Sequence, residues 1–147
     1  MSVFNPDQFL NTTYEGALDT TLIPVPETDE GWTAVVEKFE VKTTPKGQVV
    51  CELTWAIDEF EVQQQTGRDK NTVRQALWLD ITDHGTLDMG KGKNVALGRL
   101  REALNQNTPG KPWSFGMLVG QVAKVVVKHR ITDAGDTFAD VKRVLPA

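Results

Sequence analysis

The chain has 147 residues, of which 39% are hydrophobic and 24% are charged, and its formal net charge is -4. This length and composition are ordinary for one globular domain with its own core, and no apolar run reaches the roughly 18 residues of a membrane-spanning helix. The first residues lack the basic and apolar regions of a secretory signal. We therefore expect a cytoplasmic protein, in the host cytoplasm if it is viral, without a membrane partner. The single cysteine, Cys51, excludes an internal disulfide, and its place in an apolar alternation predicts a buried thiol.

Acidic and basic residues are separated along the chain. Residues 1–37 contain 7 acidic residues and no lysine or arginine, whereas residues 38–147 contain 16 basic and 13 acidic residues. Within that part, residues 68–130 contain 11 basic and 5 acidic residues. Binding to nucleic acid depends on lysine and arginine, so the negative net charge argues against such a partner. The mildly basic part of the chain, residues 38–147, favours one.

Residues 1–30 are predicted to form an extended acidic arm, since they show no sustained period and Pro24 and Pro26 interrupt them. Three roles are open for this arm: packing on the body, pairing with a neighbouring subunit, or competing with DNA for a basic groove. We favour packing, because the arm has too many apolar side chains for a free tail. These are Phe9, Leu10, Tyr14, Leu18, Leu22 and Ile23.

Residues 31–147 are predicted to form one domain that begins with three strands. Residues 32–42 and 49–58 alternate between apolar and polar side chains around a Pro-Lys-Gly turn, which predicts a hairpin. A long polar stretch follows, and alternation resumes over residues 73–82. There Val73 and Leu77 share one face while Arg74 and Trp78 share the other.

A helix and two more strands complete the domain. Leu97, Leu100 and Leu104 recur at helical spacing after Asn94, a suitable cap, which predicts a helix of about three turns. An apolar turn or short helix precedes strands over residues 121–131 and 138–145. The fold is thus predicted to be all-β with one helix between the third and fourth strands. This is the order of the OB-fold, a five-stranded barrel whose second and third strands and nearby loops commonly bind oligonucleotides or oligosaccharides.

The segment GTLDMGKG, residues 85–92, comes within one residue of a phosphate-binding P-loop. Gly85, Gly90 and Lys91 fit the motif, but Gly92 replaces the hydroxyl that would bind Mg²⁺. The segment joins a strand to a helix without a surrounding parallel βαβ frame. We therefore interpret it as a flexible linker in which Lys91 and Lys93 contact a nucleic-acid phosphate at the helix N-terminus, and not as part of an ATPase.

Residues 31–57 (GWTAVVEKFEVKTTPKGQVVCELTWAI), residues 118–147 (LVGQVAKVVVKHRITDAGDTFADVKRVLPA) and the block between them resemble a family of small bacteriophage proteins. The matching features are Val119-Gly-Gln before the fourth strand, alternating valine and lysine along it, and Phe138–Lys142 before Pro146. This resemblance, over about residues 30–147, implies an OB-fold single-stranded-DNA-binding protein encoded among replication and recombination genes. Many such proteins recruit partners with an acidic C-terminal tail, but this chain ends DVKRVLPA, so we do not expect that form of recruitment.

Binding single strands without sequence preference requires cations for the backbone and aromatic faces for the bases. Trp78 and Arg74 are predicted on the outside of the barrel, although Trp78 packed under the arm or a partner subunit is the alternative. The loop over residues 68–74 is longer than its connection requires, so we predict that it orders over DNA. The basic residues of the fourth strand fit a DNA-binding face or an ordinary solvated one. The predicted binding residues are Lys46, Arg68, Lys70, Arg74, Trp78, Lys91, Lys93, Lys124, Lys128 and Arg130.

Trp55 shares a face with Leu53 and Ile57 and is predicted in the core, and Trp32 is placed to cover a barrel end. Trp113 and Phe115 are predicted to close the barrel.

Catalysis finds little support in the sequence. His84 and His129 have no second ligand at zinc spacing, and Asp80 and Asp83 are only a weak match to a metal-dependent nuclease. We predict no catalytic residue, metal or cofactor, and a protein that coats single-stranded DNA in phage replication or recombination. Its expected partners are single-stranded DNA, replication or recombination enzymes, and further copies of itself. A structural β-barrel of a virion is the alternative, in which Trp78 is an assembly contact.

Overall fold

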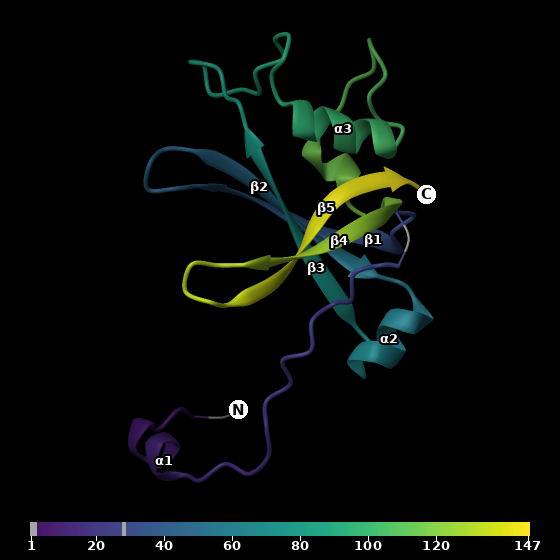
Figure 1. Ribbon diagram of the computed structural model, residues 1–147. Coiled ribbons are helices and arrows are strands. Elements are labelled where there is room, and N and C mark those ends of the chain that lie inside the picture. The colour runs from purple at the N-terminus through teal and green to yellow at the C-terminus, as the bar shows by residue number, and fades with distance from the viewer. Residues whose placement is uncertain (1–2, 28) are drawn as a thin grey trace.

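The computed structural model describes residues 3–27 and 29–147. Five strands form a closed barrel in the order β1-β2-β3-β5-β4 (Figure 1). Neighbouring strands are antiparallel except for β3 and β5, which are parallel. The prediction of a mainly β fold is confirmed at the level of a closed five-stranded sheet. The strands are β1 (Trp32–Thr43), β2 (Val49–Ile57), β3 (Asn71–Leu79), β4 (Val122–Ile131) and β5 (Thr137–Pro146).

Two register shifts interrupt the strand pairing of the barrel. One lies between Val36 and Lys38 of β1 against β2, and the other lies between Val126 and Val127 of β4 against β5. A bulge of this kind adds a residue to one strand and increases its twist. In β1 the extra residue is Glu37, so Lys38 faces outward and Phe39 packs against the core.

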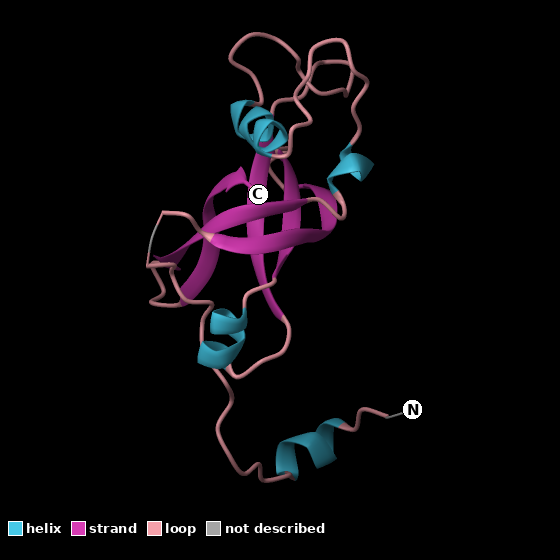
Figure 2. Cartoon of the chain, turned by 90° about the vertical axis from the view of Figure 1, so that its right-hand side faces the viewer, coloured by secondary structure: helices cyan, strands magenta, loops and turns pink. Residues whose placement is uncertain are grey.

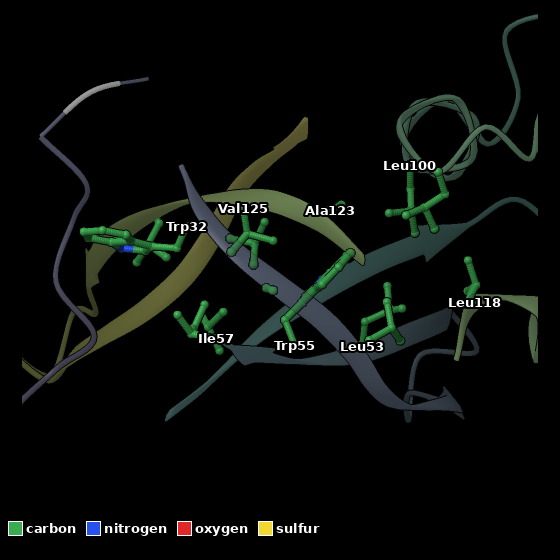
Figure 3. Packing of buried hydrophobic residues seen from close by; sticks show 14 of the residues in the cluster. Trp32, Leu53, Trp55, Ile57, Leu100, Leu118, Ala123 and Val125 are labelled. Carbon is green, nitrogen blue, oxygen red and sulfur yellow. The ribbon is translucent and has the colours of Figure 1, made fainter. Parts of the chain in front are cut away.

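The core is filled by one face of each alternating strand. Cys51, Leu53 and Trp55 of β2 are 0% exposed, and Figure 3 shows Leu53 and Trp55 among side chains from β4 and α3. The Nε1 of Trp55 donates a hydrogen bond of 2.9 Å to Oε1 of Gln75, which satisfies the polar atom of a buried indole. Trp55 is thus a core residue, as predicted.

One end of the barrel is covered by α3 (Val95–Ala103) and the 3-10 helix η1 (Phe115–Leu118). Leu97, Leu100 and Leu104 are buried at the predicted helical spacing. Nearby, Trp113 lies beneath the Arg101 guanidinium, 4.5 Å from it, and contacts Phe115 edge-on. Trp113 and Phe115 are packed against the core.

Two short helices were not predicted. The long polar stretch before β3 contains α2 (Phe60–Thr66), in which Val62 and Thr66 are the buried residues. Only the first of these two residues is apolar. The helix therefore buries too few apolar side chains to give a periodic signal in the sequence. The other is α1 (Pro6–Asn11), capped by the side chain of Asn5.

The prediction that the arm packs on the body is correct only for its second part. Ile23 is 4% exposed, and Trp32, which is 7% exposed, donates from Nε1 to the carbonyl oxygen of Pro24 at 2.8 Å. In contrast, Phe9 and Leu18 are 52% and 93% exposed. Figure 1 shows this first part leading away from the barrel.

The buried thiol gives a first testable prediction. Burial and the neighbouring Glu52 raise the pKa of Cys51 to about 11, so the thiol of the folded protein remains protonated where that of the unfolded chain ionises. We expect Cys51 to resist a thiol-specific reagent at pH 8 until urea unfolds the chain. The stability contributed by the protonated thiol is complete below pH 9.0 and falls as pH rises toward about 11. Rapid labelling without urea would contradict this expectation.

Within the described residues no helix has both the length and the apolar character to cross a membrane.

Candidate nucleic-acid interface

The exposed tryptophan of β3 lies on the outside of the barrel. Trp78 is 56% exposed, whereas Trp55 and Trp32 are buried, so its own arm does not bury it. Its partner across β2 is Val50, and the partner of Val50 on β1 is Lys42. Because all three side chains point outward, the aliphatic side chain of Val50 lies between the ring of Trp78 and the basic side chain of Lys42.

A hollow of about 380 Å³ adjoins Trp78. Its walls come from the β1–β2 hairpin at Gly47–Val49, from Trp78–Ile81, and from Asp88 and Lys93 of the loop before α3. Its volume falls in the range of roughly 300–1,000 Å³ that is usual for small-molecule sites. The predicted binding residue Lys93 therefore lies beside Trp78, and Lys46 is next to the wall-forming Gly47.

The loop with the P-loop-like sequence is held by Asn94. Its Oδ1 accepts from the backbone N–H of Asp80 at 2.8 Å, and its Nδ2 donates to the carbonyl oxygens of Asp80 and Asp88 at 2.9 and 3.0 Å. Asn94 thus makes no side-chain cap for α3, which corrects the predicted role. The residue has a left-handed backbone with φ of 52°, a conformation that asparagine tolerates. Within the segment, Asp88 is held by the hydrogen bond from Asn94 and lines the hollow, and the flexibility that the sequence predicts for the linker stays a prediction.

A row of five side chains, four of them charged, crosses the outside of the sheet and includes Arg74, on the same strand as Trp78; we call it the charged row. The backbone register aligns residues of β1, β2, β3, β5 and β4 in this order: Lys38, Thr54, Arg74, Asp140 and Lys128. Three of the five are cations, and none of these three forms an ion pair within the described part of the chain. This alignment joins two predicted binding residues on different strands. We call the outward side chains Lys38, Lys42, Arg74 and Trp78 the Trp78 face.

Sequence analysis did not identify Lys38 as a candidate. Strict alternation from Trp32, Ala34 and Val36 would turn Lys38 inward, but the bulge at Glu37 turns it outward. The sequence does contain a signal of this bulge. The inward apolar side chains fall on even-numbered residues up to Val36 and on odd-numbered residues from Phe39. Lys38 and Arg74 both line a second hollow of about 250 Å³.

Three other predicted cations are occupied by carboxylates of the same chain. Lys70 Nζ lies 2.7 Å from Glu37 Oε1, and Arg130 Nε lies 2.5 Å from Asp140 Oδ2. Arg68 lies 3.5 Å from Asp19. Such exposed pairs contribute little to stability, but each would have to exchange its carboxylate for a phosphate before it contacted DNA.

Arg68 also fastens the arm to the barrel. Its Nη2 donates to the carbonyl oxygen of Thr21 at 2.8 Å, and its Nε donates to Asn71 Oδ1 at 3.4 Å. Hydrogen bonds from Thr21, followed by the charge of Arg68, lower the pKa of Asp19. Arg68 therefore has a structural role that its sequence context did not reveal.

This role gives a second prediction. Arg68→Ala is expected to cost about 1 kcal/mol of unfolding free energy, because a hydrogen bond from a charged group is lost at a partly exposed site. Amide hydrogen exchange at Thr21 and Leu22 should increase, whereas affinity for a short oligo-dT should change little. A loss of DNA affinity equal to that of Arg74→Ala would instead assign Arg68 to the binding surface.

A second exposed aromatic ring lies on the β4–β5 hairpin. Phe138 is 48% exposed, and the Arg130 guanidinium lies 5.3 Å from its ring centroid. Phe138 and Thr72 line the same hollow of about 310 Å³. Thr72 and Trp78 lie six positions apart on one face of β3, a span of about 20 Å. Figure 1 shows the β1–β2 and β4–β5 hairpins both projecting to the left of the view, and in the sheet order β3 lies between β2 and β5.

Two predicted residues lie apart from this surface. Lys124 pairs in register with Thr33 of β1 and Leu145 of β5, and therefore has no neighbour on β2 or β3. Lys91 is exposed in the loop before α3 and does not line the hollow beside Trp78.

The carboxylate of the weak nuclease motif is also engaged: Asp80 Oδ2 accepts from the backbone N–H of Asn94 at 2.9 Å. Across residues 3–27 and 29–147, no group of three or more His, Cys, Asp or Glu side chains is placed to hold a metal ion. Comparison of the chain with protein-family models and with curated proteins gave no match.

Proposed function

We propose that this chain is an OB-fold protein that binds and protects single-stranded DNA during phage replication or recombination, largely without sequence preference. The observation that carries the proposal is the exposed ring of Trp78 beside a hollow, on the same face as Lys38 and Arg74, two cations without an ion pair among the described residues. The strand order, with α3 between β3 and β4 along the chain, supports the OB-fold. The phage context rests on the resemblance of residues 30–147.

The proposed mechanism is electrostatic attraction combined with stacking. A base stacks on Trp78, which contributes about 1–3 kcal/mol and accepts any base because every base has a π face. Phosphates meet Arg74 and Lys38, and condensed counterions are released from the strand. Coating in this way needs no bond making or breaking, so we propose no enzymatic activity.

The experiment is a titration of fluorescent oligo-dT at low and moderate salt, with tryptophan fluorescence recorded in parallel. We expect binding that weakens with salt and quenches the fluorescence, because Trp78 is the exposed indole within the described residues. A duplex of equal length is the control, since its bases cannot stack on a side chain, and it should bind more weakly. Absence of binding at low salt would overturn the proposal in favour of a structural assembly protein. Metal-dependent shortening of the oligonucleotide would favour a nuclease.

A further inference from the structure

The first part of the arm, residues 3–18, is an apolar and acidic segment that its own barrel leaves uncovered. We call this segment the arm tip. Leu10, Tyr14 and Leu18 are 77%, 69% and 93% exposed. Phe9 is 52% exposed, and its ring centroid lies 6.2 Å from that of Tyr14. Contiguous exposed apolar side chains on a folded protein commonly mark an interaction site.

The residues after the arm tip attach it to one end of the barrel. The carbonyl oxygen of Ile23 lies 2.7 Å from His129 Nε2, and that of Thr21 accepts from Arg68. Figure 2 shows the arm leaving the barrel at the end that carries α2, whereas α3 lies at the other end. These contacts fix the end of the molecule from which the arm tip projects.

A groove of about 500 Å³ lies at the end that carries α3, between this helix and the last residues of β5. Two basic side chains of its lining, Arg99 and Lys142, form no ion pair within the described part of the chain. A third, Arg143, lies 3.2 Å from Asp29, and Glu102 is the acidic residue of the lining. The apolar part of the groove is formed by Ala96, Leu100, Ala103, Val144 and Pro146.

We propose that the arm tip of one copy docks in the groove between α3 and β5 of a second copy. The groove presents an apolar floor for Phe9 and Tyr14, and its basic rim complements the arm tip, which carries Asp7 and Glu15 and no lysine or arginine. Glu15, directly after Tyr14, is placed to meet Arg99 or Lys142. A second copy is the occupant because docking within one chain would require the arm to fold back along the whole barrel.

This contact joins unlike surfaces at opposite ends of the molecule. Heterologous contacts of this kind join copies head to tail, into a closed ring where the rotation between copies closes and into an open row where it does not. The Trp78 face takes no part in the contact, because none of its four residues lines the groove. Copies joined in this way can therefore bind one DNA strand side by side.

Disulfide cross-linking of the full-length chain tests the contact without DNA. Thr13→Cys places a thiol on the exposed arm tip, and Ala96→Cys places one on the exposed edge of the groove. The natural Cys51 is 0% exposed and does not compete. One variant carries a size tag, so that the mixed dimer is resolved by electrophoresis. Ala134→Cys, in the exposed turn between β4 and β5, is the matched control for chance collisions.

The expected result is a mixed dimer of Thr13→Cys with Ala96→Cys at roughly tenfold higher yield than with Ala134→Cys, which corresponds to about 1.4 kcal/mol. Equal yields would overturn the proposal. An internal cross-link in a chain that carries both cysteines, with no mixed dimer between single variants, would also overturn it, because the arm tip would then occupy its own groove.

Binding to DNA gives a second readout. Phe9→Ser with Tyr14→Ser should bind an oligonucleotide that accommodates one copy as the natural chain does, but bind a long strand roughly tenfold more weakly. Phe60→Ser, at an aromatic residue of α2 that is 71% exposed, should affect neither. Unchanged binding of the double variant to long strands would count against head-to-tail docking. If no variant binds DNA at all, the proposed function fails, and the cross-linking result still decides the docking.

Discussion

Replacing Trp78 with leucine is expected to weaken binding of a short oligo-dT by roughly tenfold to a hundredfold. This loss corresponds to about 1–3 kcal/mol for one stacked base. Leucine retains an apolar cover over Val50, which is 5% exposed and pairs with Trp78 across β2 and β3. It lacks the flat π face, however, so stacking is lost while the fold is kept. Trp78→Phe should recover most of the affinity, because phenylalanine retains an aromatic ring.

Fluorescence anisotropy measures the affinity, and the urea midpoint of each variant verifies that the fold is intact. Phe60→Leu is the matched control, since Phe60 is an exposed aromatic residue on α2 and lies outside the Trp78 face. Equal losses for Trp78→Leu and Phe60→Leu would show that the effect does not arise from stacking at β3. An unchanged affinity for Trp78→Leu would place the binding surface elsewhere on the molecule.

The strands and α3 were predictable because each buries one face against a common core. A side-chain period of two along Val49–Ile57 puts Cys51, Leu53 and Trp55 inside, and the backbone could satisfy that pattern only as a half-buried strand. The leucines of α3 recur at helical spacing for the same reason. These periodicities arise from burial, so they are visible in the sequence before the neighbouring elements are known.

Features that depend on partners distant in the sequence were not predictable in this way. The side chain of Asn94 binds Asp80, 14 positions away, and its helix-cap chemistry alone suggested a different role. The arm contained enough apolar residues to predict packing, yet only the part around Ile23 found a buried site. Composition gives the tendency of a segment to be buried, but it does not specify a surface that can receive it.

The candidate site was predicted strand by strand and assembled only by the register. Trp78 and Arg74 lie on one strand, so alternation alone placed them together. Lys128 joins them through Asp140 of β5, and this alignment follows from the parallel contact between β3 and β5. No local pattern encodes that contact, because it is set by closure of the barrel.

Removing the three cations of the charged row is expected to reduce the salt dependence of DNA binding. For single strands, the slope of log K against log salt changes by about 0.7 for each phosphate contact. Lys38→Gln, Arg74→Gln and Lys128→Gln in one chain should therefore make the slope shallower by about 2. Affinity at low salt should fall by roughly tenfold to a hundredfold, since the released counterions are the main electrostatic driving force.

The control triple is Lys111→Gln, Lys124→Gln and Lys142→Gln, which changes the net charge equally at residues outside both the charged row and the Trp78 face. A short oligonucleotide is used, so that contacts between copies do not contribute. If affinity depended on net charge alone, both triples would reduce the affinity and the salt dependence to the same extent. The charged row would then have no special part in binding. If only the first triple makes the slope shallower, the DNA phosphates lie along the charged row, which crosses the sheet from β1 to β4. The DNA strand then crosses β3 on the face that carries Trp78, where its bases are within reach of the ring.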